Sequence, residues 1–259
     1  MLIDTHAHLT DERYGGGQAI IDSMPEDGLE KIITVGYNLE SSLRCLEIAR
    51  RNKNVYCAVG VHPSDAQELT SDPCEQLLQL SKDDKCVAIG EIGLDYFYPE
   101  TDRDKQIYWL EKQLDVVLKS GLPVCFHVRD AYEDMDKVLA KNADKLKNGV
   151  VMHCFSGSRE TAQKYVGMGF YISFSGSVTF KNAKKFYDIV PVVPLDRILI
   201  ETDCPYLTPH PHRGETNYPR FVRFQAEKIA EILGLSFDEV AAITTDNAYR
   251  IFTKMKRDL

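Results

Sequence analysis

The sequence predicts an α/β protein of the (β/α)₈ barrel class, folded as a single domain over residues 1–259. Eight short apolar runs follow one another along the chain, and segments with helical periodicity separate them. The runs are rich in β-branched residues and almost continuous in hydrophobicity, which is typical of strands buried on both faces of a parallel sheet. The length of 259 residues suits one barrel of this kind.

Turn residues bound the eight expected strands. These are LIDTHAH (2–8), KIITVG (31–36), VYCAVGVH (55–62), CVAIGEIG (86–93), LPVCFHV (122–128), GVVMHCFS (149–156), FYISFS (170–175) and RILIETD (197–203). The alternative is an open, doubly wound sheet. That fold more commonly places a glycine-rich phosphate-binding turn after its first strand, and HAHLTDERYGGG does not have that form.

The clearest helix is expected over residues 101–121. Apolar side chains recur there on one face, at Ile107, Leu110, Leu114, Val117 and Leu118. Thr101 or Asp102 is expected to cap its start, and Gly121 its end. Near the C-terminus, Ser236 and Glu239 form a capping box, which predicts a short helix followed by one or two further helical turns.

Composition and charge restrict the class of protein. The formal net charge of −8 argues against a broad basic surface that grips nucleic acid through many phosphates. We expect a cytoplasmic protein with no membrane association, because the N-terminus lacks a signal peptide and no apolar run approaches about 18 residues. The seven cysteines are scattered and form no CxxC pair, so we expect neither a disulfide framework nor a zinc knuckle.

Histidines gather where the predicted strands end. His6, His8, His62, His127 and His153 all lie at the C-terminal ends of expected strands, while the other two of the seven histidines follow the eighth strand. A barrel brings the C-terminal ends of all its strands to one mouth. We therefore expect these imidazoles to converge, although a lone histidine at a strand end is more often structural.

Two carboxylates join the histidines in otherwise apolar strands, Glu91 in the fourth and Asp203 in the eighth. A buried acid is costly unless it is paired or bound to a cation. The complete donor set is large enough for two divalent ions, with Glu91 placed to bridge them; it comprises His6, His8, Glu91, His127, His153 and Asp203. The alternative is a polar cluster without metal. Cys154 and Cys204 are not expected to ligate, since adjacent strand residues point to opposite faces.

The motifs that carry these residues resemble the metal-dependent amidohydrolase superfamily and, more closely, its TatD family of deoxyribonucleases. The matching strings, in order from Ile3 to Phe252, are DTHAHLTDERY, VGVHPSDA, GEIGLDYFY, FHVRDA, HCFSGS, FSGSVTFK, ETDCPYLTPHPHRGETNYP and DNAYRIF. The resemblance implies a barrel that hydrolyses DNA stepwise from the 3′ end and prefers single strands. It also implies that single-stranded DNA ends are the partner, and we expect a monomer.

The same resemblance distributes the ligands between two metal ions. It assigns His6, His8 and Asp203 to the first ion, His127 and His153 to the second, and Glu91 to both. The family suggests magnesium, whereas four imidazole ligands favour zinc or manganese, so Mg, Mn and Zn all stay open. In the resulting hypothesis a water molecule activated by the ions attacks phosphorus, and Asp203 accepts its proton.

Charge bears on how an acidic protein attracts DNA. Two divalent ions, offset by Glu91 and Asp203, are expected to leave the mouth at about +2, which focuses attraction on one strand end. Four residues are candidate substrate contacts. His62 is expected to donate a hydrogen bond, Arg129 and Arg213 to reach phosphates, and Tyr96 to stack on a base. The alternatives are an exposed arginine at position 129 and ordinary packing at position 96.

Two other functions fit the same residues. A metal-activated water could equally attack a carbonyl carbon, in an amide, a lactone or the ester of a mischarged aminoacyl-tRNA. A barrel that binds metal or nucleic acid without turnover is the third reading. The presence of both Glu91 and Asp203 weighs against this last one, because a lapsed site would be expected to lose an acid.

Overall fold

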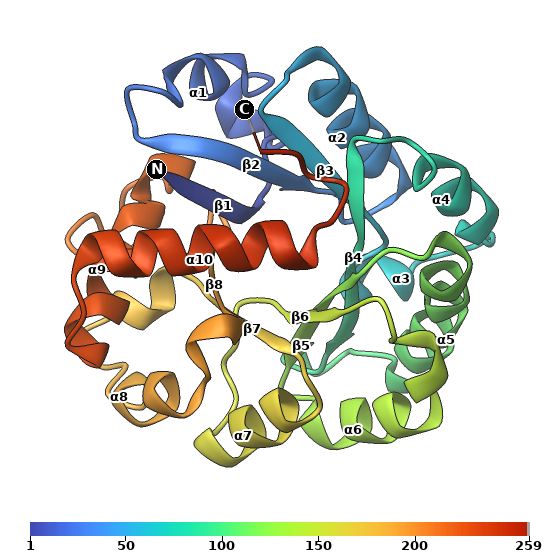
Figure 1. Ribbon diagram of the computed structural model, residues 1–259. Coiled ribbons are helices and arrows are strands. Elements are labelled where there is room, and N and C mark those ends of the chain that lie inside the picture. Colours follow the sequence, from blue (N-terminus) through green and yellow to red (C-terminus); the bar gives the residue numbers. More distant parts are fainter. Residues whose placement is uncertain (258–259) are drawn as a thin grey trace.

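Eight parallel strands wind into one barrel, as the sequence predicts. The structure is a computed structural model that describes residues 1–257, so positions 258–259 of the predicted domain lie outside the described residues. Each strand pairs with its neighbours in sequence, in the order β1 to β8 (Figure 1). The strands are β1 (Leu2–Ala7), β2 (Leu29–Val35), β3 (Val55–Val59), β4 (Cys86–Asp95), β5 (Val124–Arg129), β6 (Val150–Met152), β7 (Tyr171–Phe174) and β8 (Ile198–Ile200).

Polar side chains help to close the barrel between its first and last strands. Ala7 forms a parallel bridge with Cys204, just beyond β8. The buried carboxylate of Asp4 accepts hydrogen bonds from the backbone N–H of Thr202 at 2.9 Å and from its hydroxyl at 2.5 Å. These contacts fix the segment after β8 beside β1, so that Asp203 lies next to the histidines of β1.

Helices surround the barrel. They are α1 (Gln18–Ser23), α2 (Leu39–Arg51), α3 (Pro63–Ala66), α4 (Cys74–Leu80), α5 (Arg103–Ser120), α6 (Tyr132–Lys141), α7 (Arg159–Gly167), α8 (Phe186–Ile189), α9 (Val222–Leu233) and α10 (Phe237–Ile251). Short 3₁₀ segments add η1 (Glu12–Tyr14), η2 (Ala143–Lys145), η3 (Gly176–Thr179), η4 (Val190–Val192), η5 (Leu195–Arg197) and η6 (Pro219–Phe221). None of the helices in residues 1–257 is long and apolar enough to cross a bilayer.

The caps expected at two helices are present. Asp102 accepts from the backbone N–H of Lys105 at the start of α5, and Gly121 ends that helix with a φ of 68°. Ser236 and Glu239 form the capping box of α10. The prediction of a short helix followed by further turns was wrong, because α10 runs without a break from Phe237 to Ile251.

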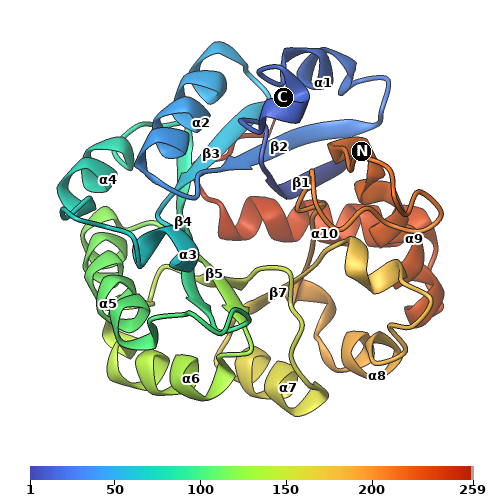
Figure 2. The same cartoon turned by 180° about the vertical axis from the view of Figure 1, so that it is seen from behind.

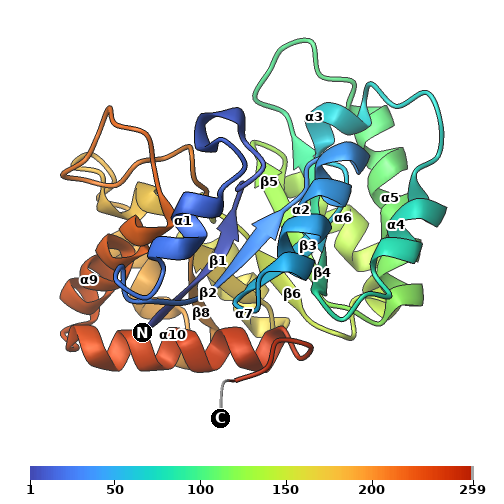
Figure 3. The same ribbon diagram turned by 90° about the horizontal axis from the view of Figure 1, so that it is seen from above.

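One end of the barrel is covered by α10. The inner core of the barrel, which includes Ile33, Val151 and Leu199, continues into Ile251 and Phe252 at the end of this helix. Figures 1 and 3 show α10 lying across the end of the barrel from which the strands start. A substrate can therefore approach only the opposite end, where the strands finish.

Candidate metal centre

The structure brings all six predicted ligands to the mouth of the barrel. His6 lies in β1 and His8 directly follows it, Glu91 and His127 lie in β4 and β5, and His153 and Asp203 follow β6 and β8. Two groups within this set could each hold an ion, because the donor atoms of each group all lie within 4.8 Å of one another. One group is His6, His8 and Asp203, and the other is Glu91, His127 and His153. The elements that deliver these side chains are far apart in sequence.

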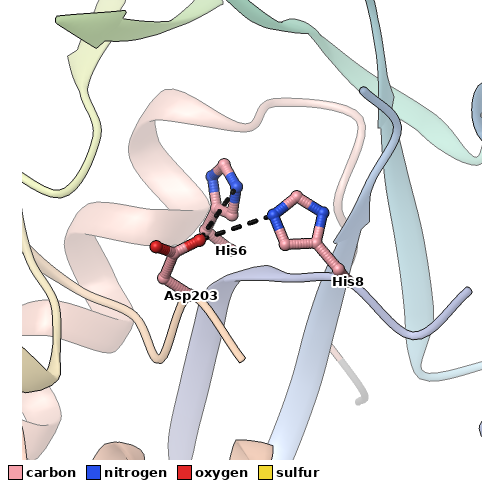
Figure 4. A group of neighbouring side chains, drawn as sticks. All are labelled: His6, His8 and Asp203. Atoms are coloured by element: carbon pink, nitrogen blue, oxygen red, sulfur yellow. Dashed lines mark ion pairs between the residues drawn. The ribbon is translucent and has the colours of Figure 1, made fainter. Parts of the chain in front are cut away.

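The first group has the spacing of a metal site (Figure 4). Nε2 of His8 lies 3.4 Å from Oδ1 of Asp203, and Nε2 of His6 lies 3.8 Å from the same oxygen. Donors at about 2.1 Å from a tetrahedral ion are about 3.4 Å apart. Both separations are longer than an ordinary hydrogen bond and are appropriate for atoms that share a cation.

Glu91 connects the two groups through its two carboxylate oxygens. Oε2 lies 3.4 Å from Nε2 of His6 and 3.9 Å from Nε2 of His8. Oε1 lies 2.7 Å from Nδ1 of His127 and 3.1 Å from Nε2 of His153. Each oxygen thus faces a different pair of imidazoles, which is the arrangement of a carboxylate that bridges two cations.

His6 supplies a test of whether a metal fits. Its side chain is 1% exposed, and neither ring nitrogen has a hydrogen-bond partner among the described residues. Its ring stacks on that of His153 with a centroid distance of 3.7 Å. Buried polar atoms without partners are rare and costly. A cation between His6, Glu91 and Asp203 would satisfy Nε2, so the residues fit a bound metal.

Electrostatics in the cluster also favour a cation. Burial raises the pKa of Glu91, but the surrounding imidazoles, His153 first, outweigh it and hold that pKa well below its usual range. Burial lowers the pKa of His127, yet hydrogen bonds to Asp95 and Glu91 raise it to about 9. When no metal is bound, the carboxylates therefore keep a neighbouring imidazole protonated, and this imidazolium supplies the positive charge.

His62 has a different role from the other histidines. It is the N-cap of α3, and its Nδ1 accepts a hydrogen bond from the backbone N–H of Ser64 at 3.2 Å. Burial lowers its pKa to about 3, so the ring is neutral and carries its proton on Nε2, 3.7 Å from Oε1 of Glu91. His62, Asp95 and His127 lie close enough to form a third donor group. In this tautomer, however, the free nitrogen of His62 carries a proton, so the ring acts as a hydrogen-bond donor.

Two acids that orient the histidines were missed in the sequence. Oδ2 of Asp95 lies 3.1 Å from Nε2 of His127, and Oε1 of Glu201 forms an ion pair with Nδ1 of His153 at 2.8 Å. Carboxylates of this kind fix the ring orientation of metal-binding histidines. Alternation along a strand could have found both, since Asp95 lies four residues after Glu91 and Glu201 two residues before Asp203.

The metal centre opens into a cavity of about 460 Å³, here called the metal cavity. Arg129 lines it, and its guanidinium lies 3.5 Å from the centre of the Phe97 ring. The arginine therefore faces the site, as the prediction of a substrate contact requires. Three exposed or half-exposed tyrosines also line it: Tyr37, Tyr98 and Tyr206.

The other two predicted substrate contacts lie outside the lining of the metal cavity. Tyr96 donates its hydroxyl to Asp134 at 3.1 Å and lies beneath Arg103, so Tyr98 takes the place at the rim that was expected for Tyr96. Arg213 donates to the carbonyl of Thr208 at 2.8 Å. Its guanidinium lies 3.9 Å from the centre of the Phe180 ring, beside a neighbouring cavity.

The structure adds charged groups to those behind the expected charge of about +2 at the mouth. Five carboxylates line the metal cavity: Asp11, Asp65, Glu91, Asp95 and Asp203. The expectation included only Glu91 and Asp203. Arg13 pairs with Asp11 at 2.7 Å, so two divalent ions and Arg129 against the other four acids would leave the mouth at about +1. Attraction of an anionic strand must then come partly from another surface.

The argument that excluded both cysteines holds for only one of them. Cys154 has a φ of 44°, which turns the chain after β6 out of the strand geometry on which the alternation depends. Its sulfur consequently lies within 4.8 Å of the donor atoms of His153 and Asp203. Burial raises the pKa of the Cys154 thiol to about 12, which disfavours a thiolate ligand. Cys204 belongs to none of the donor groups within residues 1–257.

A (β/α)₈ barrel with two histidine and carboxylate groups at its strand C-terminal ends belongs to the class of metal-dependent hydrolases. Residues 3–253 match the family model described as TatD related DNase. The chain belongs to this family.

The similarity to the relatives below extends over almost the whole chain. It is 43% identical to the metal-dependent hydrolase YabD of Bacillus subtilis over 253 residues, which cover 97% of this chain and 99% of that protein. Identity to the metal-dependent hydrolase YcfH of Escherichia coli K12 is 39%, over 97% of this chain and 95% of YcfH. The crystal structure of YjjV, a TatD homologue from E. coli K12, superposes with a TM-score of 0.91 at 30% identity and covers 97% of this chain and 98% of YjjV.

Proposed function

We propose that the protein is a metal-dependent phosphodiesterase that removes nucleotides from the 3′ ends of single-stranded DNA. The position of Glu91 carries the proposal, because its two oxygens face two separate pairs of imidazoles. Two-metal sites of this form are common among nucleases and phosphatases. Membership of a family described as TatD related DNase supports DNA as the polymer.

The proposed ligand sets follow the two groups at the mouth. His6, His8 and Asp203 would hold one ion, His127 and His153 the other, and Glu91 both. Bound divalent ions lower the pKa of water and neutralise charge on a phosphodiester. The four imidazoles favour zinc or manganese over magnesium, which prefers oxygen ligands.

The chain's own residues supply the proton transfers and the positioning. Oδ1 of Asp203 faces His6 and His8, and among the described residues Oδ2 has no hydrogen bond, so Oδ2 is placed to accept the proton of the attacking water. His62 donates from Nε2 to an oxygen of the scissile phosphate. Arg129, on the wall of the metal cavity, binds a second phosphate oxygen.

The cavity favours a strand end over duplex DNA. Its volume of about 460 Å³ is that of a pocket which encloses a small group. Tyr37, Tyr98 and Tyr206 present aromatic rings at its wall, on which unpaired bases can stack. Bases inside a duplex are stacked between their neighbours, so single strands offer more free faces and are the better substrates.

One assay distinguishes the proposed function from its alternatives. Protein stripped with chelator receives Mg²⁺, Mn²⁺ or Zn²⁺ singly, and is offered oligonucleotides labelled at either end together with simple esters and amides. Stepwise shortening from the 3′ end is the expected result. Cleavage of carbonyl substrates alone would instead indicate an amidase or esterase, and inertness with every metal a binding protein.

The Asp203→Asn variant tests the proposed base in the same assay. We expect kcat to fall by about 10²–10⁴-fold, because a positioned general base contributes that much, while the unfolding midpoint stays near that of the wild type. Asp104→Asn, at an exposed position in the first turn of α5, is the matched control and should retain full activity. Near-normal turnover by Asp203→Asn would contradict the assignment.

A further inference from the structure

A second cavity lies along the loop after β8, which also contributes to the metal cavity. Its volume is about 500 Å³, and it is formed by η3, α8, α9 and the loop after β8. Three lysines and three aromatic residues characterise it, and it is called the lysine cavity here; they are Lys181, Lys184, Lys228, Phe180, Tyr187 and Phe224. Neither the resemblance nor the proposed reaction gives it a role.

Two of the lysines are free to meet an external anion. The cavity also contains Glu227 and Glu231, but Arg223 binds the first at 3.0 Å and Lys228 binds the second at 2.6 Å. Lys181 and Lys184 are exposed, and they form no ion pair with any residue in 1–257. The acids of the cavity are therefore neutralised locally, and the two lysines give it a positive charge.

Tyr187 and Phe224 provide aromatic faces for unpaired bases. Tyr187 is 51% exposed, and its hydroxyl donates to Glu231 at 2.6 Å, which holds the ring at the cavity wall. Phe180 lies beneath the guanidinium of Arg213, and Phe224 lines the cavity from α9. Proteins that bind single strands combine cations for phosphates with such rings for bases.

The loop after β8 joins the two cavities. Asp203 and Tyr206 of this loop line the metal cavity, whereas His210 and Pro211 line the lysine cavity. The loop is held against η3, since the backbone N–H of His210 donates to Thr179 at 2.8 Å. Gly176 permits this approach, because an added Cβ would lie 1.9 Å from the carbonyl oxygen of Leu207. Figure 2 shows η3 and this loop beside each other at the open end of the barrel.

We propose that the lysine cavity is a secondary site for single-stranded nucleic acid, which binds the part of the strand upstream of the scissile nucleotide. The inference deepens the proposed nuclease function and rests on it. It answers the charge problem at the mouth, where five carboxylates leave little excess positive charge even with two ions bound. Lys181 and Lys184 bind the phosphates, and the rings of Tyr187 and Phe224 stack on bases.

The test compares strands of different length. Fluorescein-labelled oligo(dT) of 2, 4, 8 and 12 nucleotides is titrated in EDTA, so that binding is measured without cleavage, and hydrolysis of the same strands is then measured with metal. In the double variant Lys181→Met and Lys184→Met we expect about tenfold weaker binding of the 12-mer. The slope of log K against log salt should fall by about 1.4, since each lost phosphate contact contributes about 0.7. Cleavage of the dinucleotide should not change.

The control pair Lys119→Met and Lys147→Met removes the same charge from exposed lysines at the end of α5 and before β6, near the closed end of the barrel. It should bind the 12-mer like the wild type. A second variant, Tyr187→Ala, should weaken 12-mer binding by at least about fivefold, while Tyr187→Phe should not, because stacking needs the ring.

The outcomes separate the two proposals. If no phosphodiester is cleaved with any metal, the proposed function is contradicted. The binding measurements in EDTA still test whether the lysine cavity binds single strands. If phosphodiesters are cleaved but the lysine variant binds and cleaves the 12-mer like the wild type, the secondary site is contradicted. The same holds if the wild type binds no strand in EDTA, or if the variant loses the dinucleotide and the 12-mer equally.

Discussion

Glu91 shows how a single buried carboxylate depends on its neighbours. It is 4% exposed. A charged carboxylate isolated from water in this way costs considerable free energy unless a positive charge lies nearby. Imidazoles surround it on both sides, and each oxygen has its own pair. The site is therefore stable only when positive charge lies near Glu91, supplied either by protonated histidines or by metal.

Glu201 tests whether contacts behind the ligands matter. It is 1% exposed, and its carboxylate also accepts from the backbone N–H of Cys154 and the hydroxyl of Ser173, both at 2.6 Å. Glu201→Gln removes the negative charge that faces Nδ1 of His153, which makes this imidazole a weaker ligand. We expect metal affinity to fall by about 10–100-fold, measured by competition with a fluorescent chelator. Glu26→Gln, at an exposed position, is the control, and equal affinities in both variants would contradict this role.

The pKa of His127 predicts how metal binding depends on pH. Because hydrogen bonds raise this pKa to about 9, the imidazole is protonated at pH 7 and a metal ion must displace the proton. Burial lowers the pKa of His153, but Glu201 and Glu91 raise it well above its usual value, so this second ligand also releases a proton. Affinity should therefore rise by at least about tenfold per pH unit between pH 7 and 9. Calorimetry in buffers of different ionisation enthalpy measures the release. A constant affinity over this range would show that His127 is not a ligand.

At the scale of elements, the backbones of β4 and β5 meet closely at Gly93, which pairs with His127 two residues after Glu91. Gly93 in β4 has a φ of 152°, and a Cβ at this position would lie 1.9 Å from the carbonyl oxygen of His127. Any side chain would push the two strands apart. Glycine is thus required at position 93 both by the positive φ and by the short distance to the carbonyl oxygen of His127.

Gly93→Ala should destabilise the protein by about 3 kcal/mol or more, because the strain falls on the backbone of two central strands. Urea unfolding measures the change. Gly167→Ala is a matched control at the end of α7, where a Cβ meets no described atom within 4 Å and the change should stay within about 1 kcal/mol. Similar stabilities of the two variants would argue against the strand spacing described here.

Sequence patterns were sufficient to predict the elements that carry the site. Apolar runs located all eight strands, and their C-terminal ends located the six donors, because a barrel leaves those ends at one mouth. Patterns failed where the chain leaves regular geometry. The turned backbone at Cys154 defeated the alternation argument, and the single helix α10 includes turns that were expected to be separate.

Other features depend on contacts between distant segments and have no local signal. The lysine cavity combines residues near 180, 210 and 228, which come together only after β7, β8 and α9 have packed. The excess of acids at the mouth arises in the same way, since Asp11 lies in the loop after β1 and Asp65 lies in α3, after β3. Neither the position of Arg213 nor that of Tyr96 follows from its sequence neighbours.

At the scale of the whole molecule, the two ends of the barrel differ. The inner core closes the end where the strands start, with α10 packed across it, and the metal cavity lies at the other end. A net charge of −8 repels a polyanion from most of the surface. The proposed binding of a nucleic-acid strand would therefore depend on the metal ions and on the local lysines.

The central claim is that Glu91 lies between two cation sites, and anomalous diffraction from crystals soaked with Mn²⁺ tests it most directly. We expect two anomalous peaks per chain, one near His6, His8 and Asp203 and the other near His127 and His153, with a carboxylate oxygen of Glu91 facing each. A single peak, peaks away from Glu91, or two undiminished peaks in Glu91→Gln crystals would contradict the claim.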